Sequence, residues 1–175
     1  MEIEFDLNKQ DYIDFNIFHA MNSDTVKKSL VIQRYLAPII FLIVPFLIAG
    51  LADLPLIYWM CVFIVIGAVW IIFYPKYFKA MILKRVAKIL DEGKNEDLWG
   101  KHRVIVNEEG LLEQSKNGEN KINWNGVERI VSLNQHFFIY ISSVSACIIP
   151  KRAFKTNEDT VMFYEFITKH INSKN

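Results

Sequence analysis

Charge is almost absent between Arg34 and Lys76, where Asp53 is the only residue with an ionisable carboxylate or base. The two halves of this stretch read LAPIIFLIVPFLIAGLA and LPLIYWMCVFIVIGAVWIIFY, and neither has the polar stripe that a globular helix presents to water. As helices they would span about 25 Å and about 31 Å, close to the thickness of a bilayer core. We therefore expect a transmembrane helical hairpin at residues 35–75, with spans at about 36–52 and 54–74. A helical hairpin buried in a soluble core is the alternative.

Cysteine is scarce and a strong net charge is missing. Cys61 in the second expected span and Cys147 in a strand-like stretch lie on opposite sides of the expected interface, so we expect no disulfide between them. The formal net charge of +1 does not suit a nucleic-acid binder. A cleavable signal peptide is not expected, because the first apolar run starts late and acidic residues precede it.

The motifs of common enzymes are missing as well. The sequence has no glycine-rich phosphate loop, no H-E-x-x-H and no paired-cysteine motif. Serines near residue 143 lack the Gly-x-Ser-x-Gly setting that activates a nucleophile. The four histidines are scattered along the chain, at His19, His102, His136 and His170. We expect no enzyme, with no catalytic residue, no cofactor and no metal site.

Basic residues flank the apolar stretch on both sides, and the turn inside it has none. Because Lys and Arg near the ends of spans stay in the cytoplasm, we expect both termini to be cytoplasmic in a multi-pass protein of the plasma membrane. The bases after the second span lie in an amphipathic segment, residues 76–93. They are candidate contacts for anionic lipid headgroups, or they only mark the topology: Lys76, Lys79, Lys84, Arg85 and Lys88.

In the residues before the apolar stretch, the spacing of apolar side chains changes from a period of two to helical spacing. Ile3, Phe5 and Leu7 alternate with acids, which predicts a half-buried strand within residues 1–8. Residues 9–34 have helical spacing and predict amphipathic cytoplasmic helices. Ser23 or Asp24 is expected to cap the second of these helices, which runs on into the membrane.

Residues 99–175 predict a small antiparallel β domain closed by a C-terminal helix. Six strands are expected after Trp99, with Asn-Gly turns between some of them, and Trp124 is placed at the end of one strand. Asn157 is expected to cap the C-terminal helix. The fold class is therefore an α+β membrane protein.

Three pieces of this segment resemble the C-terminal domain of YcxB-like proteins: Trp124, the sequence FIY at 138–140 and the sequence IIPKRAF at 148–154. The layout of a paired span followed by this domain is similar too. The resemblance implies a bacterial inner-membrane protein whose domain is like a pleckstrin-homology fold, and it implies no activity. Such a fold has seven strands and a helix, so the strand at residues 3–7 would supply the seventh by pairing with the C-terminal sheet.

We weigh three functions. The first is a membrane-anchored interaction or sensing module that presents the domain to a protein partner or to lipid headgroups. The second is a small oligomeric transporter or pore subunit, which the apolar spans disfavour. The third is an enzyme at the membrane, which the missing motifs disfavour. Lys151 and Arg152 are candidate partner or phosphate contacts, or solvated charges at a strand end.

Overall fold

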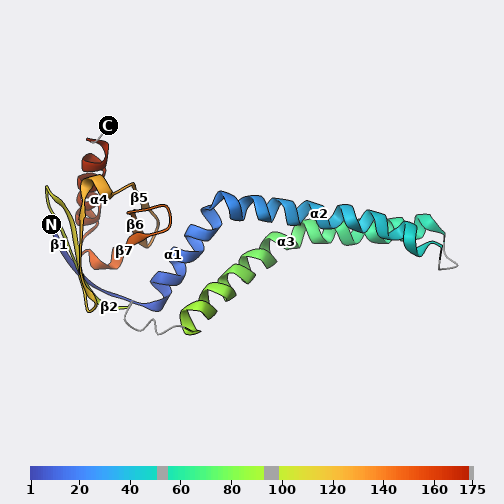
Figure 1. Cartoon of the computed structure of the whole chain (residues 1–175), viewed down its shortest axis with the longest axis horizontal. Helices are drawn as coiled ribbons and strands as arrows, with labels where there is room; N and C mark the ends of the chain where they lie inside the picture. Colours follow the sequence, from blue (N-terminus) through green and yellow to red (C-terminus); the bar gives the residue numbers. More distant parts are fainter. Residues whose placement is uncertain (51–54, 93–98, 174–175) are drawn as a thin grey trace. The chain divides into compact units, whose positions relative to one another are not determined.

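The computed structural model describes residues 1–50, 55–92 and 99–173 of the chain. The described chain forms two compact units (Figure 1). One unit combines Met1–Asn16 with Ala87–Asn175, and we call it the sheet unit. The other is Ile17–Val86, and we call it the helical unit. The expected cap at Asp53 and the expected helix stop at Gly93 lie outside the described residues.

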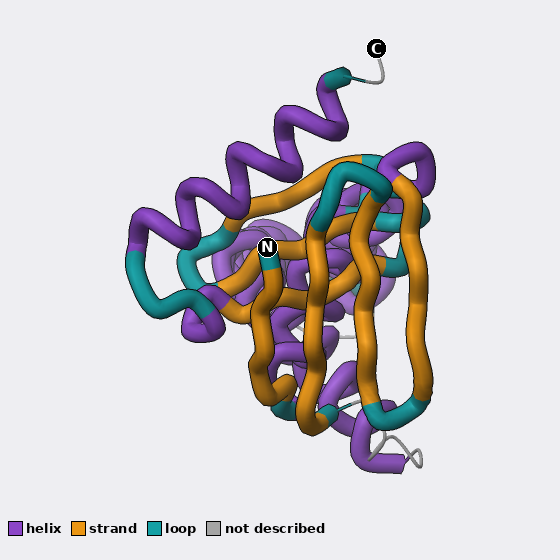
Figure 2. Tube along the Cα trace, turned by 90° about the vertical axis from the view of Figure 1, so that its left-hand side faces the viewer, coloured by secondary structure: helices purple, strands orange, loops and turns teal. Residues whose placement is uncertain are grey.

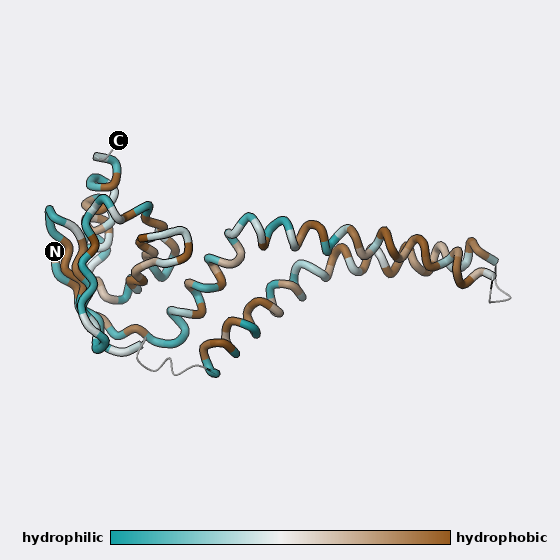
Figure 3. The backbone as a smooth tube through the Cα atoms, in the orientation of Figure 1, coloured by the Kyte–Doolittle hydropathy of each residue, from teal (hydrophilic) through white to brown (hydrophobic). Residues whose placement is uncertain are grey.

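Two long apolar helices make up most of the helical unit: α2 (Asp24–Ile48) and α3 (Leu56–Glu92). Both are long and apolar enough to cross a membrane, and apolar residues follow one another along them (Figure 3). In their most apolar windows only 6% of the residues are buried. Helix α1 (Lys9–Asn22) precedes α2. Between them Ser23 is the N-cap residue of α2, as expected, with an extended backbone, but its side chain makes no capping hydrogen bond.

Helices α2 and α3 touch where small and ring-shaped side chains let the backbones approach. A Cβ atom added to Gly67 would lie 3.5 Å from the Cβ of Pro38. The indole ring of Trp70 packs edge-on against Phe41, at a centroid distance of 6.0 Å. Pro75 lies inside α3, yet the helix continues through it. The expected second span and the expected basic segment are therefore parts of one helix.

The first sheet of the sheet unit has the order β1-β2-β3-β4 (Figure 2). Its strands are β1 (Glu2–Leu7), β2 (Gly100–Val106), β3 (Gly110–Ser115) and β4 (Gly118–Asn123). The pairing expected for residues 3–7 is present, because β1 runs antiparallel to β2 with Ile3 opposite Val104. The apolar helices are thus inserted in the chain between β1 and β2, two strands that lie side by side in one sheet. At Gly110 an added Cβ would lie 2.1 Å from a backbone oxygen, so only glycine fits this start of β3.

The second sheet has the order β5-β6-β7. Its strands are β5 (Arg129–Ser132), β6 (His136–Tyr140) and β7 (Ala146–Pro150). Every residue of β6 is buried, and with the inner faces of its neighbours and the last helix it forms the core. The mixed α+β class and the antiparallel pairing are confirmed.

Helix α4 (Asn157–Asn172) closes the chain and buries Phe163 and Ile167. Its N-cap is Thr156, which forms a reciprocal capping box with Asp159, so the expected cap at Asn157 is wrong by one residue. Trp124 lies in the short 3-10 turn η2 (Trp124–Gly126) rather than in a strand. A second 3-10 turn, η3 (Lys151–Ala153), follows β7.

Candidate functional site

A buried carboxylate lies at the start of α1 and joins this first turn to η3 and to the start of β6. Asp11 accepts two hydrogen bonds from the guanidinium of Arg152, at 2.8 Å to Oδ1 and 2.6 Å to Oδ2. Nε2 of His136 lies 2.7 Å from the same Oδ1. The Asp11 side chain is only 3% exposed and that of His136 only 5%. We call these three residues the Asp11 cluster.

The local sequence explains why Asp11 is held so firmly. The Asn8 side chain accepts from the Asp11 backbone N–H at 3.0 Å, and the Asn8 backbone N–H donates to Oδ2 of Asp11 at 2.8 Å. This reciprocal pair is a capping box with Asn and Asp in place of the usual residues. The first turn of α1 therefore holds the carboxylate through contacts that do not involve Arg152.

The electrostatics of the cluster favour the charged carboxylate. Burial raises the pKa of Asp11, but hydrogen bonds from Arg152, Asn8 and His136 more than offset burial and leave this pKa below its ordinary value. The same bond with Asp11 raises the pKa of Arg152. Because the pair is bidentate and one partner is buried, it fixes the first turn of α1 within the sheet unit.

Apolar contacts continue the attachment one turn further along α1. Ile13 and Phe15 are buried, and the Phe15 ring packs edge-on against Phe138 of β6 at 5.2 Å. The His136 ring stacks on the same Phe138 ring, with the two centroids 5.7 Å apart. The first turns of α1 are therefore part of the sheet unit, although the chain goes on from them into the apolar helices.

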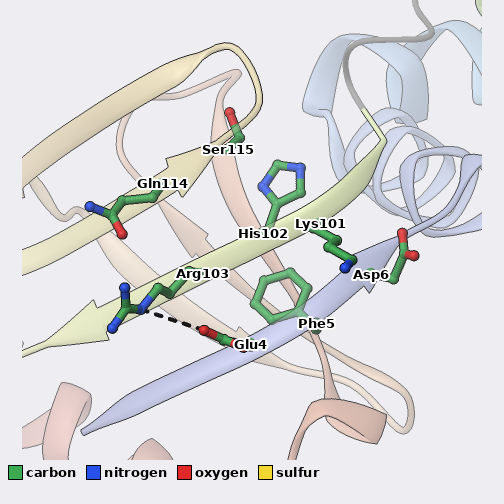
Figure 4. A pocket seen from close by; sticks show the side chains of 8 residues that line it. All are labelled: Glu4, Phe5, Asp6, Lys101, His102, Arg103, Gln114 and Ser115. Atoms are coloured by element: carbon green, nitrogen blue, oxygen red, sulfur yellow. Dashed lines mark ion pairs between the residues drawn. The ribbon is translucent and has the colours of Figure 1, made fainter.

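A shallow cavity of about 470 Å³ lies over β1, β2 and β3 (Figure 4). Figure 4 shows Phe5 and His102 side by side at its centre, and their rings stack at 5.9 Å. Arg103 forms ion pairs with Glu2 at 2.6 Å and with Glu4 at 3.7 Å. Charges of both signs, polar side chains and one apolar ring line this cavity: Glu4, Phe5, Asp6, Lys101, His102, Arg103, Gln114 and Ser115.

A second group of ionisable side chains lies inside the domain next to this cavity. Nδ1 of His102 is 3.2 Å from Oε1 of Glu113. Burial, followed by the charge of Glu113, raises the pKa of Tyr12 to about 12 and that of Cys147 well above its ordinary value. A thiol that stays protonated is not an activated nucleophile. In the part of the chain that the structure describes, no three metal-binding side chains come together.

The basic residues predicted as contacts are in two places. All five bases between Lys76 and Lys88 are exposed along α3, and Lys88 pairs with Glu92 at 3.4 Å. Their contact with anionic lipid stays a prediction. Lys151 donates to the Ser132 hydroxyl at 3.1 Å and lies over the Phe137 ring.

Arg152 has a role inside the domain that sequence reasoning did not assign to it. Besides Asp11, it donates to the backbone oxygen of Asp6 at 2.8 Å, so both terminal nitrogens of its guanidinium are engaged. Its role as a partner contact stays a prediction. Asp11 and His136 were not expected as site residues at all. The one signal for Asp11 was the spacing of Asn8 and Asp11 ahead of an apolar run.

These features define an α+β chain in which two long apolar helices are inserted in the sequence of a two-sheet domain, and the domain holds a buried ion cluster between the start of α1, β6 and η3. Residues 106–167 match the family model described as YcxB-like protein. The resemblance seen in the sequence is confirmed for this C-terminal part of the chain. Searches among curated proteins and among solved structures gave no match.

Proposed function

We propose that this protein is a membrane-anchored, non-enzymatic interaction or sensing module that presents its sheet unit to the cytoplasm. In this proposal α2 and α3 span the plasma membrane as a hairpin and both termini are cytoplasmic. The sheet unit then acts as a domain of the pleckstrin-homology kind, which binds a partner protein or lipid headgroups.

The observation that carries the proposal is the exposure of the two apolar helices. Large side chains point outward along both of them, with Leu47 68% exposed and Ile57 73% exposed. Monomeric soluble proteins rarely expose apolar patches beyond a few hundred Å². A bilayer covers such a surface, and the helices satisfy their own backbone hydrogen bonds as a bilayer requires.

The domain architecture supports the interaction part. The seven described strands form a four-stranded and a three-stranded antiparallel sheet, and a C-terminal helix packs against them. This element count is the one that the pleckstrin-homology likeness implied. The helical hairpin enters after β1 and returns before β2, and Asp11 adds a non-covalent attachment. The apolar helices are therefore joined to the domain by two chain connections, and Asp11 holds the start of the first connection within the sheet unit, which suits a domain that reports on its anchor.

The exposed bases of α3 support a location next to anionic lipid. Each base close to an anionic surface contributes about 1 kcal/mol. We expect full-length protein with Lys84→Gln and Arg85→Gln to lose protection of the α3 backbone in anionic nanodiscs, measured by hydrogen exchange. Identical exchange in neutral and anionic nanodiscs would leave these bases with a topological role only.

Topology mapping tests the proposal as a whole. A reporter fused after Asn175 should be active only when it is cytoplasmic, and a cysteine at Ala52 in a Cys61→Ser background should react with an impermeant reagent from outside. Recovery of the full-length chain in the soluble fraction, or outside labelling of the sheet unit in intact cells, would overturn it. Ion flux through reconstituted protein would favour the transporter instead.

A further inference from the structure

The outer edge of β1 is open beside a groove of the sheet unit. The Val106 N–H donates to the Met1 oxygen at 2.8 Å, which fixes the hydrogen-bonded pairs of the β1–β2 ladder. In an antiparallel ladder such pairs alternate, so Ile3 and Phe5 bond to β2 while Glu2 and Glu4 direct their N–H and C=O groups away from it. Among the described residues these groups of Glu2 and Glu4 have no hydrogen-bond partner.

At Asp6, the outward backbone oxygen of this edge already accepts a hydrogen bond, as the oxygens of Glu2 and Glu4 would from an added strand. The Asp6 oxygen accepts a hydrogen bond from Nη2 of Arg152 at 2.8 Å. This bond shows independently that the backbone groups at the even-numbered positions of β1 point away from β2. It also ends the open edge, so the free backbone groups are those of Glu2 and Glu4, with the N–H of Asp6.

A groove of about 450 Å³ runs along these free groups. The start of β1 forms one wall, and the segment between η3 and the first turn of α4 forms the other. Figure 2 shows β1 at the edge of the four strands, with η3 and the start of α4 beside it. Phe154 on the far wall is held by its ring contact with Phe163 at 5.0 Å. The groove therefore offers backbone partners on one side, and on the other the apolar side chains of Ala153 and Phe154 beside one base, Lys155, and one acid, Asp159.

We propose that the β1 edge takes an extended segment of a partner protein as an added strand, and that this segment has Lys or Arg at alternate positions with apolar side chains between them. The inference gives the interaction part of the proposed function its class of partner, and it rests on that function. Main-chain hydrogen bonds to Glu2 and Glu4 would hold the segment, and its side chains would select it.

The charges of β1 decide which segment fits. Glu2, Glu4 and Asp6 are exposed on one face of the strand, and Arg103 of β2 already pairs with two of them from the inner side. Side chains directly across from one another in a sheet attract when their charges are opposite and repel when they are alike. A second copy of β1 would place acids against acids, whereas a basic strand completes the pattern that Arg103 begins. The apolar residues of that strand would face Ala153 and Phe154.

Peptide binding to the full-length protein in detergent tests this inference. The probe is a capped heptapeptide with lysine at alternate positions and valine between them. Matched peptides carry glutamate in place of lysine, or N-methyl groups that block one edge of the backbone. We expect the lysine peptide to bind and to slow amide exchange at Glu2 and Glu4, while both matched peptides bind at least tenfold more weakly.

Two substitutions separate backbone pairing from charge. Glu4→Pro removes one outward N–H at a position where an edge strand tolerates proline, and it should weaken binding about tenfold. Glu4→Gln should weaken binding roughly two- to fivefold. Glu119→Gln removes the same charge from the other edge strand, β4, and should change nothing. If Glu4→Pro fails to fold, Glu4→Gln and the N-methylated peptide still decide.

The inference is overturned if the lysine peptide does not bind, if the N-methylated peptide binds equally well, or if protection appears at β4. It is also overturned if the protein is a dimer that Glu4→Pro dissociates, because the edge then pairs with a second copy. These results leave the membrane topology unaffected. A chain that binds the peptide yet does not insert into membranes would refute the anchor and keep the strand addition.

Discussion

Nε of Arg34 in α2 donates a hydrogen bond to the backbone oxygen of Ile71 in α3, at 3.0 Å. That oxygen needs a donor from outside its own helix, because the residue four positions further on is Pro75, which has no N–H. A side chain of α2 thus satisfies a backbone acceptor of α3 that its own helix leaves without a donor. The same end of the hairpin holds further polar contacts, since Tyr74 and Trp70 both reach Gln33.

We expect Arg34→Met to destabilise the helical hairpin by about 1–3 kcal/mol, the cost of leaving the Ile71 oxygen unsatisfied. Pro75→Ala restores the backbone N–H, so the same Arg34→Met change should cost clearly less in a Pro75→Ala background. The measurement is thermal unfolding of the four proteins in one detergent. Equal costs in both backgrounds would show that Arg34 acts otherwise than through that oxygen.

We expect Arg152→Met to destabilise the sheet unit by about 3–5 kcal/mol, because it leaves the buried Asp11 carboxylate without its main partner. Asp11→Asn with Arg152→Met should cost less than the sum of the two single changes, since no charge is then stranded. Hydrogen exchange of the β6 amides in the full-length protein reads this out. Lys151→Met is the matched control, because it removes the adjacent base and leaves Asp11 paired.

The pH at which acid unfolds the sheet unit should depend on the pair of Asp11 and Arg152. The pKa of Asp11 is lowered from its ordinary value of 3.8, so its contribution to stability is present above that pH and is lost as the pH falls through the folded pKa. In the Arg152→Met variant the hydrogen bonds that offset the effect of burial are fewer, so we expect the pKa of Asp11 to rise. The acid unfolding midpoint, measured by circular dichroism, should then move to higher pH. An unchanged midpoint would contradict this coupling.

Trp124 should anchor α4 to the sheets. Its indole N–H donates to the Asn107 oxygen at 3.1 Å, and its ring stacks on His170 at 4.8 Å. We expect Trp124→Ala to cost about 3–5 kcal/mol and to make the sheet unit protease-sensitive, with membrane insertion unchanged. Val144→Ala, at a site 69% exposed, is the control and should not change protease resistance. Resistance of Trp124→Ala equal to wild type would contradict the anchoring role.

Much of the fold could be predicted from short-range patterns. The alternation at Ile3, Phe5 and Leu7 indicated a strand with one buried face, and all three are buried in β1. The Asn117-Gly118 pair indicated a hairpin, and β3 and β4 form one, with Lys116 and Asn117 in the turn and Gly118, at a positive φ of 133°, as the first residue of β4. Periods of two and tight turns are local properties, so the sequence alone carries them.

The candidate site could not be predicted in the same way. Asp11 and Arg152 are 141 positions apart, and no local pattern indicates that they meet. Thr156 and Asp159 did carry a capping signal, but the neighbouring Asn157 is an equally good cap residue by type. Trp124 was placed at the end of a strand, before the Asn125-Gly126 turn, whereas its packing against Phe166 of α4 accompanies a 3-10 turn that begins at Trp124 itself.

The insertion of the helices between β1 and β2 also sets an order of events during synthesis. Met1 and its partner Val106 are 105 positions apart. At the usual 5–20 residues per second, β1 waits roughly 5–20 s after leaving the ribosome before β2 is made. Both apolar helices are translated in that interval, so the first sheet closes only after they have emerged. The two apolar helices therefore leave the ribosome before the first sheet can finish folding.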